Sequence, residues 1–112
     1  MKSTDIGALF EGLASSPDLR PFCELITPLE LHDREHNSDL VRTIEVFFAA
    51  NANASETADR LFLHRNSIPY RLERVRELTG LDLKDHRARL ALQLGLLASS
   101  DGRRKNYEAE HP

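Results

Sequence analysis

The sequence predicts an all-α fold, a compact bundle of about five to six helices. Apolar residues recur at steps of three and four in successive segments, which is the period of a helix with one buried face. Proline, glycine or paired asparagines separate these segments, and such residues end helices and form turns. No segment reads as a credible strand, so the layers of the domain are expected to be helices alone.

The length of 112 residues suits one domain with a single core. Hydrophobic residues make up 40% of the chain and charged residues 29%, as in ordinary globular domains. No apolar run reaches the roughly 18–20 residues that cross a bilayer, and the N-terminus lacks a secretory-signal pattern. Cys23 is the only cysteine, which excludes an internal disulfide and favours a reducing, cytoplasmic setting. We expect a helical domain over residues 9–99, between a flexible N-terminus at 1–8 and a disordered tail at 100–112.

Two helices are predicted before residue 32. A short amphipathic helix begins around Ile6 and ends near residues 15–16. Pro17 suits the first turn of a second helix, which we expect to close before Pro28 because proline disrupts a helix interior. Residues 32–37 then form a polar connection.

The strongest amphipathic stripe of the first half follows this connection. Ser38 is a suitable N-cap for the third helix. The apolar residues of this helix repeat at steps of three and four: Leu40, Val41, Ile44, Phe47 and Phe48. Asn51 and Asn53 favour a turn, after which a short helix is predicted over residues 55–62, with the small Ala58 on its inward side.

Pro69 determines where the next helix begins. Proline is tolerated only in the first turn of a helix, so the start must fall at residues 65–67. Gly80 supplies a residue that turns left-handed at the C-terminal end of this helix. Asp85 then caps a last helix over residues 86–99.

The segment around Pro69 has a positive net charge in an otherwise acidic chain. Residues 64–76 include four arginines and one glutamate, a charge of +3 in a chain whose net charge is −3, so the remainder carries −6. Salt screens charges beyond about 8–10 Å, and attraction to phosphate is therefore a local property. A basic segment on an acidic body is compatible with binding to nucleic acid.

At about 100° per residue, the helix that contains Pro69 has an inward and an outward sector. The inward sector is apolar, with Ile68, Leu72, Val75 and Leu78, and the outward sector contains Ser67, Tyr70, Arg71 and Arg74. Arginine suits bidentate contact with phosphate or guanine. A short helix, a tight connection and a helix with a basic face form the plan of a helix-turn-helix, here over about 55–79. In that plan Arg65, Asn66 and Ser67 would lie nearest the bases of double-stranded DNA.

Residues 57–72 read TADRLFLHRNSIPYRL and resemble the C-terminal helix-turn-helix of PucR-type transcriptional regulators, which typically read TAxxLxVHxNTVxYRL. Residues 77–83, ELTGLDL, are similar to a second segment of that family, and the stretch from Pro28 to Ile44 resembles its PL…D…ELxxTL pattern. The similarity covers residues 9–98. It implies a Fis-like helix-turn-helix in a bacterial or archaeal regulator of the purine-catabolism or sugar-diacid type. Members usually carry a long N-terminal sensory region, which we expect to be absent from this chain.

The resemblance implies DNA-contact roles for the residues that match the motif: His64, Arg65, Asn66, Ser67, Tyr70 and Arg71. The sector analysis adds Arg74. Three departures from the family pattern matter. Pro69 replaces a residue that is often polar, which removes one expected contact, and Ser67 lacks the methyl group of the usual threonine. His32 replaces a common tyrosine, which bears on packing.

A second hypothesis is a helical dimerisation or interaction module whose helix-turn-helix does not bind DNA, which Pro69 and the acidic net charge favour. Leucines occupy nearly the whole circumference of the last helix. Either this helix is buried on both sides by the bundle, or Leu92 and Leu96 form a homodimer interface.

Other functional classes find little support in the sequence. His32 and His36 have the i,i+4 spacing of zinc ligands, but no third ligand is evident. No Ser/His/Asp group, paired carboxylates or glycine-rich loop indicates catalysis or nucleotide binding. We therefore expect no catalytic residue, metal or cofactor.

Overall fold

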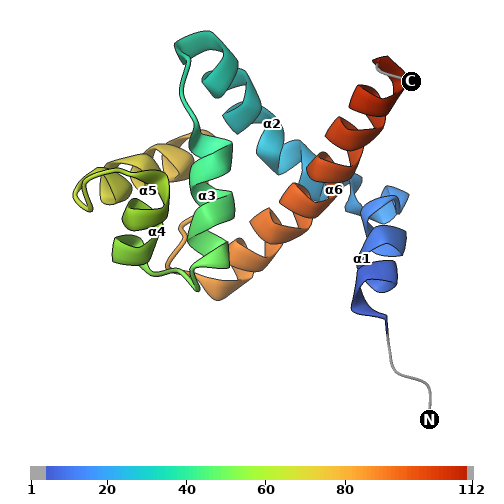
Figure 1. Ribbon diagram of the computed structural model, residues 1–112, viewed down its shortest axis with the longest axis horizontal. Helices are drawn as coiled ribbons and strands as arrows, with labels where there is room; N and C mark the ends of the chain where they lie inside the picture. Colours follow the sequence, from blue (N-terminus) through green and yellow to red (C-terminus); the bar gives the residue numbers. More distant parts are fainter. Residues whose placement is uncertain (1–4, 111–112) are drawn as a thin grey trace.

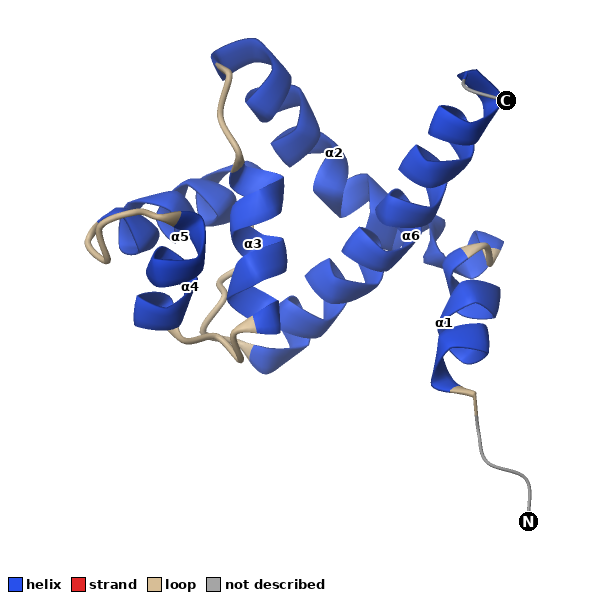
Figure 2. Ribbon diagram, viewed as in Figure 1, coloured by secondary structure: helices blue, strands red, loops and turns tan. Residues whose placement is uncertain are grey.

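A computed structural model describes residues 5–110 of the chain, with side chains described through Ser100. The described residues form helices and no strand, which confirms the predicted fold class (Figure 2). In chain order the elements are α1 (Ile6–Ala14), the short 3-10 helix η1 (Pro17–Leu19), α2 (Arg20–His36), α3 (Leu40–Ala49), α4 (Ala54–Leu61), α5 (Ser67–Thr79) and α6 (His86–Glu110).

The helices form two groups, which meet where α2 packs against α3 and α5 and where α6 packs against α3 (Figure 1). Helices α2 and α6 pack against each other over a long crossing, and α1 lies beside α6 at the far side of the molecule. Helices α3, α4 and α5 pack together in a three-helix cluster. The α4–α5 pair is therefore presented on the opposite side of the molecule from α1.

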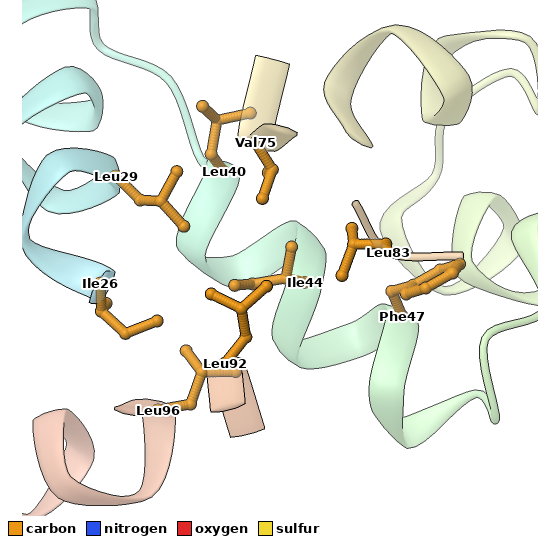
Figure 3. Close-up of a cluster of buried hydrophobic side chains, with 9 residues drawn as sticks. All are labelled: Ile26, Leu29, Leu40, Ile44, Phe47, Val75, Leu83, Leu92 and Leu96. Carbon is orange, nitrogen blue, oxygen red and sulfur yellow. The ribbon is translucent and has the colours of Figure 1, made fainter. Parts of the chain in front are cut away.

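A single apolar core joins the two groups (Figure 3). Ile26 of α2, Ile44 of α3 and Leu92 of α6 are completely buried at its centre. The remaining members come from α2, α3, α5, α6 and the connection between α5 and α6: Leu29, Leu40, Phe47, Val75, Leu83 and Leu96. Because α5 contributes Val75 to this core, the orientation of α5 is set by the packing of α2, α3 and α6.

The burial of Leu92 and Leu96 corrects one expectation. Their side chains are 0% and 8% exposed within a single chain. They cannot also form a dimer interface without opening the core, so the homodimer contact predicted through these two leucines is wrong. The alternative interpretation, a last helix buried by the bundle on both sides, fits the structure at these positions.

Helix α2 continues eight residues beyond Pro28, so the predicted end of the helix before this proline is wrong. Proline inside a helix removes one hydrogen bond and costs about 3 kcal/mol. Burial of a leucine such as Leu29, which is 0% exposed, contributes about 1.5–3 kcal/mol and offsets most of this loss. Most of the predicted polar connection at 32–37 is consequently helical, and α2 ends at the left-handed Asn37 (φ 52°).

The beginning of α3 is stabilised by a residue other than the predicted Ser38 cap. Asp39 occupies the N-cap position, and its side chain makes no capping hydrogen bond. Instead, the Asp33 carboxylate of α2 accepts the N–H groups of Leu40 (2.8 Å) and Val41 (3.0 Å). It also accepts the hydroxyl of Ser38 at 2.5 Å. This arrangement requires α2 to continue past Pro28, which is why the pattern of the sequence did not reveal it.

Several predicted boundaries in the second half are confirmed. Pro69 lies in the first turn of α5, and Gly80 ends this helix with a φ of 76°. The Asp85 carboxylate accepts the N–H of Arg87 at 3.0 Å at the start of α6. Helix α6 then extends to Glu110, past the end expected at Ser99, so residues 100–110 are helical where disorder was expected. Residues 1–4 and 111–112 of the predicted flexible ends lie outside the described residues, whereas residues 6–8 belong to α1.

Candidate nucleic-acid interface

Helices α4 and α5 form a helix-turn-helix at the position predicted. Thr57 and Ala58 of α4 are buried, and the small Ala58 side chain permits the close approach of its neighbours. Helix α4 ends at Leu61, and the next residue, Phe62, adopts a left-handed conformation (φ 57°) and is 92% exposed. The N–H of Leu63 then bonds to the Ala58 carbonyl at 2.9 Å, which closes the turn.

The connection into α5 is a second tight turn made of exposed residues. The Nδ1 atom of His64 accepts the N–H of Asn66 at 3.1 Å, so the proton of the neutral imidazole is on Nε2. The His64 carbonyl accepts the N–H of Ser67 at 2.9 Å. His64 is thus fixed at the N-terminal end of α5 with one donor, Nε2–H, left for another molecule.

Arg65 and Asn66 are exposed beside this turn. The Arg65 carbonyl accepts the N–H of Ile68 at 3.3 Å, whereas its side chain makes no hydrogen bond or ion pair with any described residue. Asn66 occupies the N-cap position of α5, but its side chain makes no capping bond. Both side chains therefore remain available at the end of α5 where the helix dipole is positive.

The outward face of α5 continues with Tyr70 and Arg74. The Tyr70 side chain is 79% exposed. Arg74 is exposed and donates to Glu77 at 2.9 Å on the same helix. Ser67 is only partly exposed, at the edge of this face. An exposed ion pair of this kind contributes roughly 0–1 kcal/mol, so Arg74 can exchange its partner at low cost.

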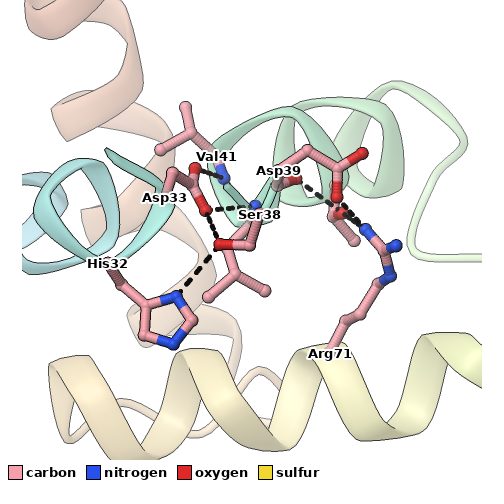
Figure 4. A network of polar contacts seen from close by, with 8 residues as sticks. His32, Asp33, Ser38, Asp39, Val41 and Arg71 are labelled. Atoms are coloured by element: carbon pink, nitrogen blue, oxygen red, sulfur yellow. Dashed lines mark hydrogen bonds and ion pairs between the residues drawn. The ribbon is translucent and has the colours of Figure 1, made fainter. Parts of the chain in front are cut away.

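Arg71 does not share the outward face, contrary to the sector prediction. Its guanidinium reaches α3, where Nη1 donates to the Asp39 carboxylate and to the Thr43 hydroxyl at 3.0 Å (Figure 4). At about 100° per residue Arg71 lies only roughly 60° from Ile68, which points into the core. This angular position places Arg71 at the border between the buried and exposed faces, and its side chain is 27% exposed.

Arg76 and Glu73 form an ion pair on the flank of α5, one of the two possibilities that the sequence left open. The Glu73 carboxylate accepts both Nε and Nη2 of Arg76. The hydrogen bond from Arg76 holds the pKa of Glu73 below its ordinary value of 4.5. The same contact raises the pKa of Arg76 above its ordinary value, so both groups are charged at neutral pH.

An open groove with a volume of about 670 Å³ separates the end of α2 from α5. Its lining is mainly polar and comes from α2, the α2–α3 connection and α5: His32, Asn37, Ser38, Asp39, Leu40, Tyr70, Arg71 and Arg74. The structure thus brings Tyr70, Arg71 and Arg74 together in one groove. His64, Arg65 and Asn66 are not among the residues that line it.

Sequence reasoning missed the acids and hydroxyls around Arg71. Asp33 and Ser38 form a polar network with His32, whose Nδ1 lies 3.0 Å from the Ser38 hydroxyl (Figure 4). The Ser38 proton is donated to Asp33, so Nδ1 of His32 must be the donor in this contact. Asp39 and Thr43 are equally new to the site. Their sequence signal, a spacing of four residues at the start of α3, is too common to have identified them.

The described residues contain neither a candidate metal site nor a helix that could cross a membrane. The part of the chain that the structure describes holds no group of three or more His, Cys, Asp or Glu residues able to bind a metal ion. None of its helices combines the length and the apolar character that crossing a membrane requires.

The chain is similar to characterised regulators over about two thirds of its length. It is 43% identical over 74 residues to the carbohydrate diacid regulator of Escherichia coli, covering 65% of this chain and 19% of the relative. It is 35% identical over 79 residues to the purine catabolism regulatory protein of Bacillus subtilis, covering 70% and 15%. Over 69 residues it is 35% identical to the proline-responsive transcriptional activator PutR of B. subtilis, covering 62% and 17%. The chain therefore corresponds to less than a fifth of the length of each of these relatives.

No solved structure shows significant similarity to the chain. The family described as the PucR C-terminal helix-turn-helix domain matches residues 40–98, from the first residue of α3 into α6. This match spans more than half of the chain and contains the whole three-helix cluster of α3, α4 and α5. The chain belongs to the PucR C-terminal helix-turn-helix domain family, as the sequence resemblance predicted.

Proposed function

We propose that this domain binds duplex DNA by placing the N-terminal end of α5 in the major groove. The observation that carries the proposal is the exposed turn at His64, Arg65 and Asn66, which offers uncommitted donors at the positive end of a helix. In a helix-turn-helix this end of the second helix approaches the base edges. The domain then serves as the DNA-binding part of a PucR-type transcriptional regulator.

The proposed contacts divide into two groups. Arg65, Asn66 and His64 are assigned to base edges and adjacent phosphates at the groove-entering end. Tyr70 and Arg74 extend the contact along α5, and Ser67 contributes a hydroxyl at the border between the groups. Arginine reads guanine through two parallel hydrogen bonds, and each such contact contributes about 1–3 kcal/mol of discrimination against another base.

The test begins with selection of bound duplexes from a random pool, followed by anisotropy titration of a selected duplex and a scrambled one at two salt concentrations. Arg65→Ala is expected to weaken binding and, if Arg65 contacts a phosphate, to flatten the slope of log K against log salt by about 0.9. Arg20→Ala is a matched control. Arg20 is exposed at the start of α2, which lies near α1 and away from α4 and α5 (Figure 1).

Two results would contradict the proposal. The first is the absence of binding to either duplex at low salt. The second is equal weakening by Arg65→Ala and Arg20→Ala, which would indicate attraction by net charge without a defined interface.

The second candidate function is a helical interaction module that does not bind DNA. One observation favours it: α1 exposes four large apolar side chains, Ile6 at 62%, Leu9 at 62%, Phe10 at 52% and Leu13 at 39%. Such a patch is typical of interaction surfaces. The same titration separates the two candidates, because the module predicts no DNA complex together with a dimeric mass in light scattering.

A further inference from the structure

Arg71 is held by two residues of α3, although it belongs to the helix proposed to read DNA. Its Nη1 donates to the Asp39 carboxylate and to the Thr43 hydroxyl (Figure 4). Thr43 is completely buried, and its hydroxyl donates to the Asp39 carbonyl at 2.8 Å. The Thr43 oxygen therefore has its proton committed and accepts from Arg71 in a fixed direction.

The Asp39 carboxylate is available to Arg71 because a different acid, Asp33, caps α3. A carboxylate at the N-cap position ordinarily accepts the first free N–H groups of its helix. Here Asp33 accepts the N–H groups of Leu40 and Val41, and the Asp39 side chain makes no capping bond. The Asp39 carboxylate is directed across the helix interface to Arg71 instead.

Both contacts with α3 use the same nitrogen of the guanidinium. They leave the Nε and Nη2 edge of Arg71 unused, and two parallel N–H groups on one edge are what a bidentate contact to guanine or phosphate requires. Arg71 lines the open groove beside Tyr70 and Arg74, and its side chain is 27% exposed. A side chain that is already immobile loses less conformational entropy on binding.

We propose that Asp39, supported by Thr43, is a positioning residue that holds Arg71 ready for a bidentate contact with DNA. The inference rests on the proposed function and deepens it. It assigns Asp39 a favourable role even though a carboxylate near DNA repels phosphate. The two effects have opposite signs, which makes the role of Asp39 measurable.

The experiment titrates the selected and the scrambled duplex with the whole chain and with Asp39→Ala. This variant removes one negative charge, yet it is expected to weaken binding to the selected duplex about fivefold or more and to lower the ratio of the two affinities. Asp59→Asn removes the same charge from the neighbouring helix α4 and is the matched control, because Asp59 is exposed and its side chain forms no ion pair with a proposed contact residue. It is expected to bind both duplexes as tightly as the unmodified chain or more tightly.

Two further variants connect the effect to Arg71. Asp39→Asn keeps an oxygen that can accept from Nη1, so it should recover part of the lost affinity and discrimination. It also keeps the shape of the side chain, which protects the test against a folding defect in Asp39→Ala. In the Arg71→Ala background the addition of Asp39→Ala should no longer weaken binding, since the residue being positioned is gone.

The outcomes separate the inference from the proposed function. If the unmodified chain binds neither duplex, both fail. If it binds and Asp39→Ala binds the selected duplex equally well or more tightly with the same discrimination, only the positioning role is overturned. A loss of the same size with and without Arg71 would also overturn it, because Asp39 would then act independently of Arg71.

Discussion

The crossing of α2 and α6 depends on the absence of a side chain at Gly95. A Cβ atom added there would lie 2.3 Å from the Phe22 carbonyl oxygen and 2.9 Å from Cγ1 of Ile26. The first of these neighbours is backbone, so Gly95→Ala forces the two helices apart. Inserting one methyl group into a packed core typically costs about 1–3 kcal/mol. In an open helix interior the same substitution would stabilise the protein by about 0.8–1.0 kcal/mol, so the clash must reverse the sign.

Gly12→Ala in α1 is the matched control, because a Cβ at that position has no neighbour within 4 Å. We expect Gly95→Ala to lower the free energy of unfolding by about 1–2 kcal/mol and Gly12→Ala to raise it or leave it unchanged. Urea titration followed by far-ultraviolet circular dichroism measures both. In a thermal scan a loss of 1 kcal/mol corresponds to a fall in Tm of roughly 4–8 °C for a domain of this size. An equally stable or more stable Gly95→Ala variant would refute the close crossing.

Three further predictions concern the turns and the ion pairs. Asp33→Ala should lower the free energy of unfolding by about 1–2 kcal/mol in urea titration, because the first N–H groups of α3 lose their acceptor; an unchanged midpoint would count against this cap. Phe62→Gly should raise Tm, corresponding to up to about 1 kcal/mol, because Phe62 is left-handed and packs against little. Phe62→Ala should not raise Tm, because alanine at this position has the same left-handed strain. The stabilising contribution of Glu73 should be present above its ordinary pKa of 4.5 and disappear as the pH falls through the lower folded-state pKa. The unfolding midpoints of Glu73→Gln and the unmodified chain should therefore converge in acid, and a gap that persists there would contradict the pairing with Arg76.

Local signals were sufficient for α4, for α5 and for the start of α6, but not for the end of α6. Pro69 and Gly80 act through backbone chemistry alone, so the limits of α5 followed from the sequence. Pro28 is also a strong local signal, but there the packing of Leu29 against the core overrides it. Pro28 lies between the buried residues Ile26 and Leu29, and the free energy of burying them offsets the loss of one helical hydrogen bond.

The exposed turn of the candidate site was also predictable from the sequence, whereas the residues of α3 that contact Arg71 were not. His64, Arg65 and Asn66 are exposed in the structure because they form a turn, which the position of Pro69 already required. The partners of Arg71 lie 28 and 32 residues earlier in the chain. No periodicity connects them, and only the packing of α3 against α5 brings them together.

Ion pairs reduce the positive charge that residues 64–76 can offer to phosphate. The sequence assigned a charge of +3 to residues 64–76, but three of the four arginines there are paired with acids: Arg71 with Asp39, Arg74 with Glu77 and Arg76 with Glu73. Arg65 alone among the four forms no ion pair in the described part of the chain. The attraction for phosphate is consequently weaker than the count of arginines indicates. The proposed recognition of DNA therefore depends more on the geometry of a few oriented donors, and we expect removal of Arg65 to weaken DNA binding more than removal of Arg76.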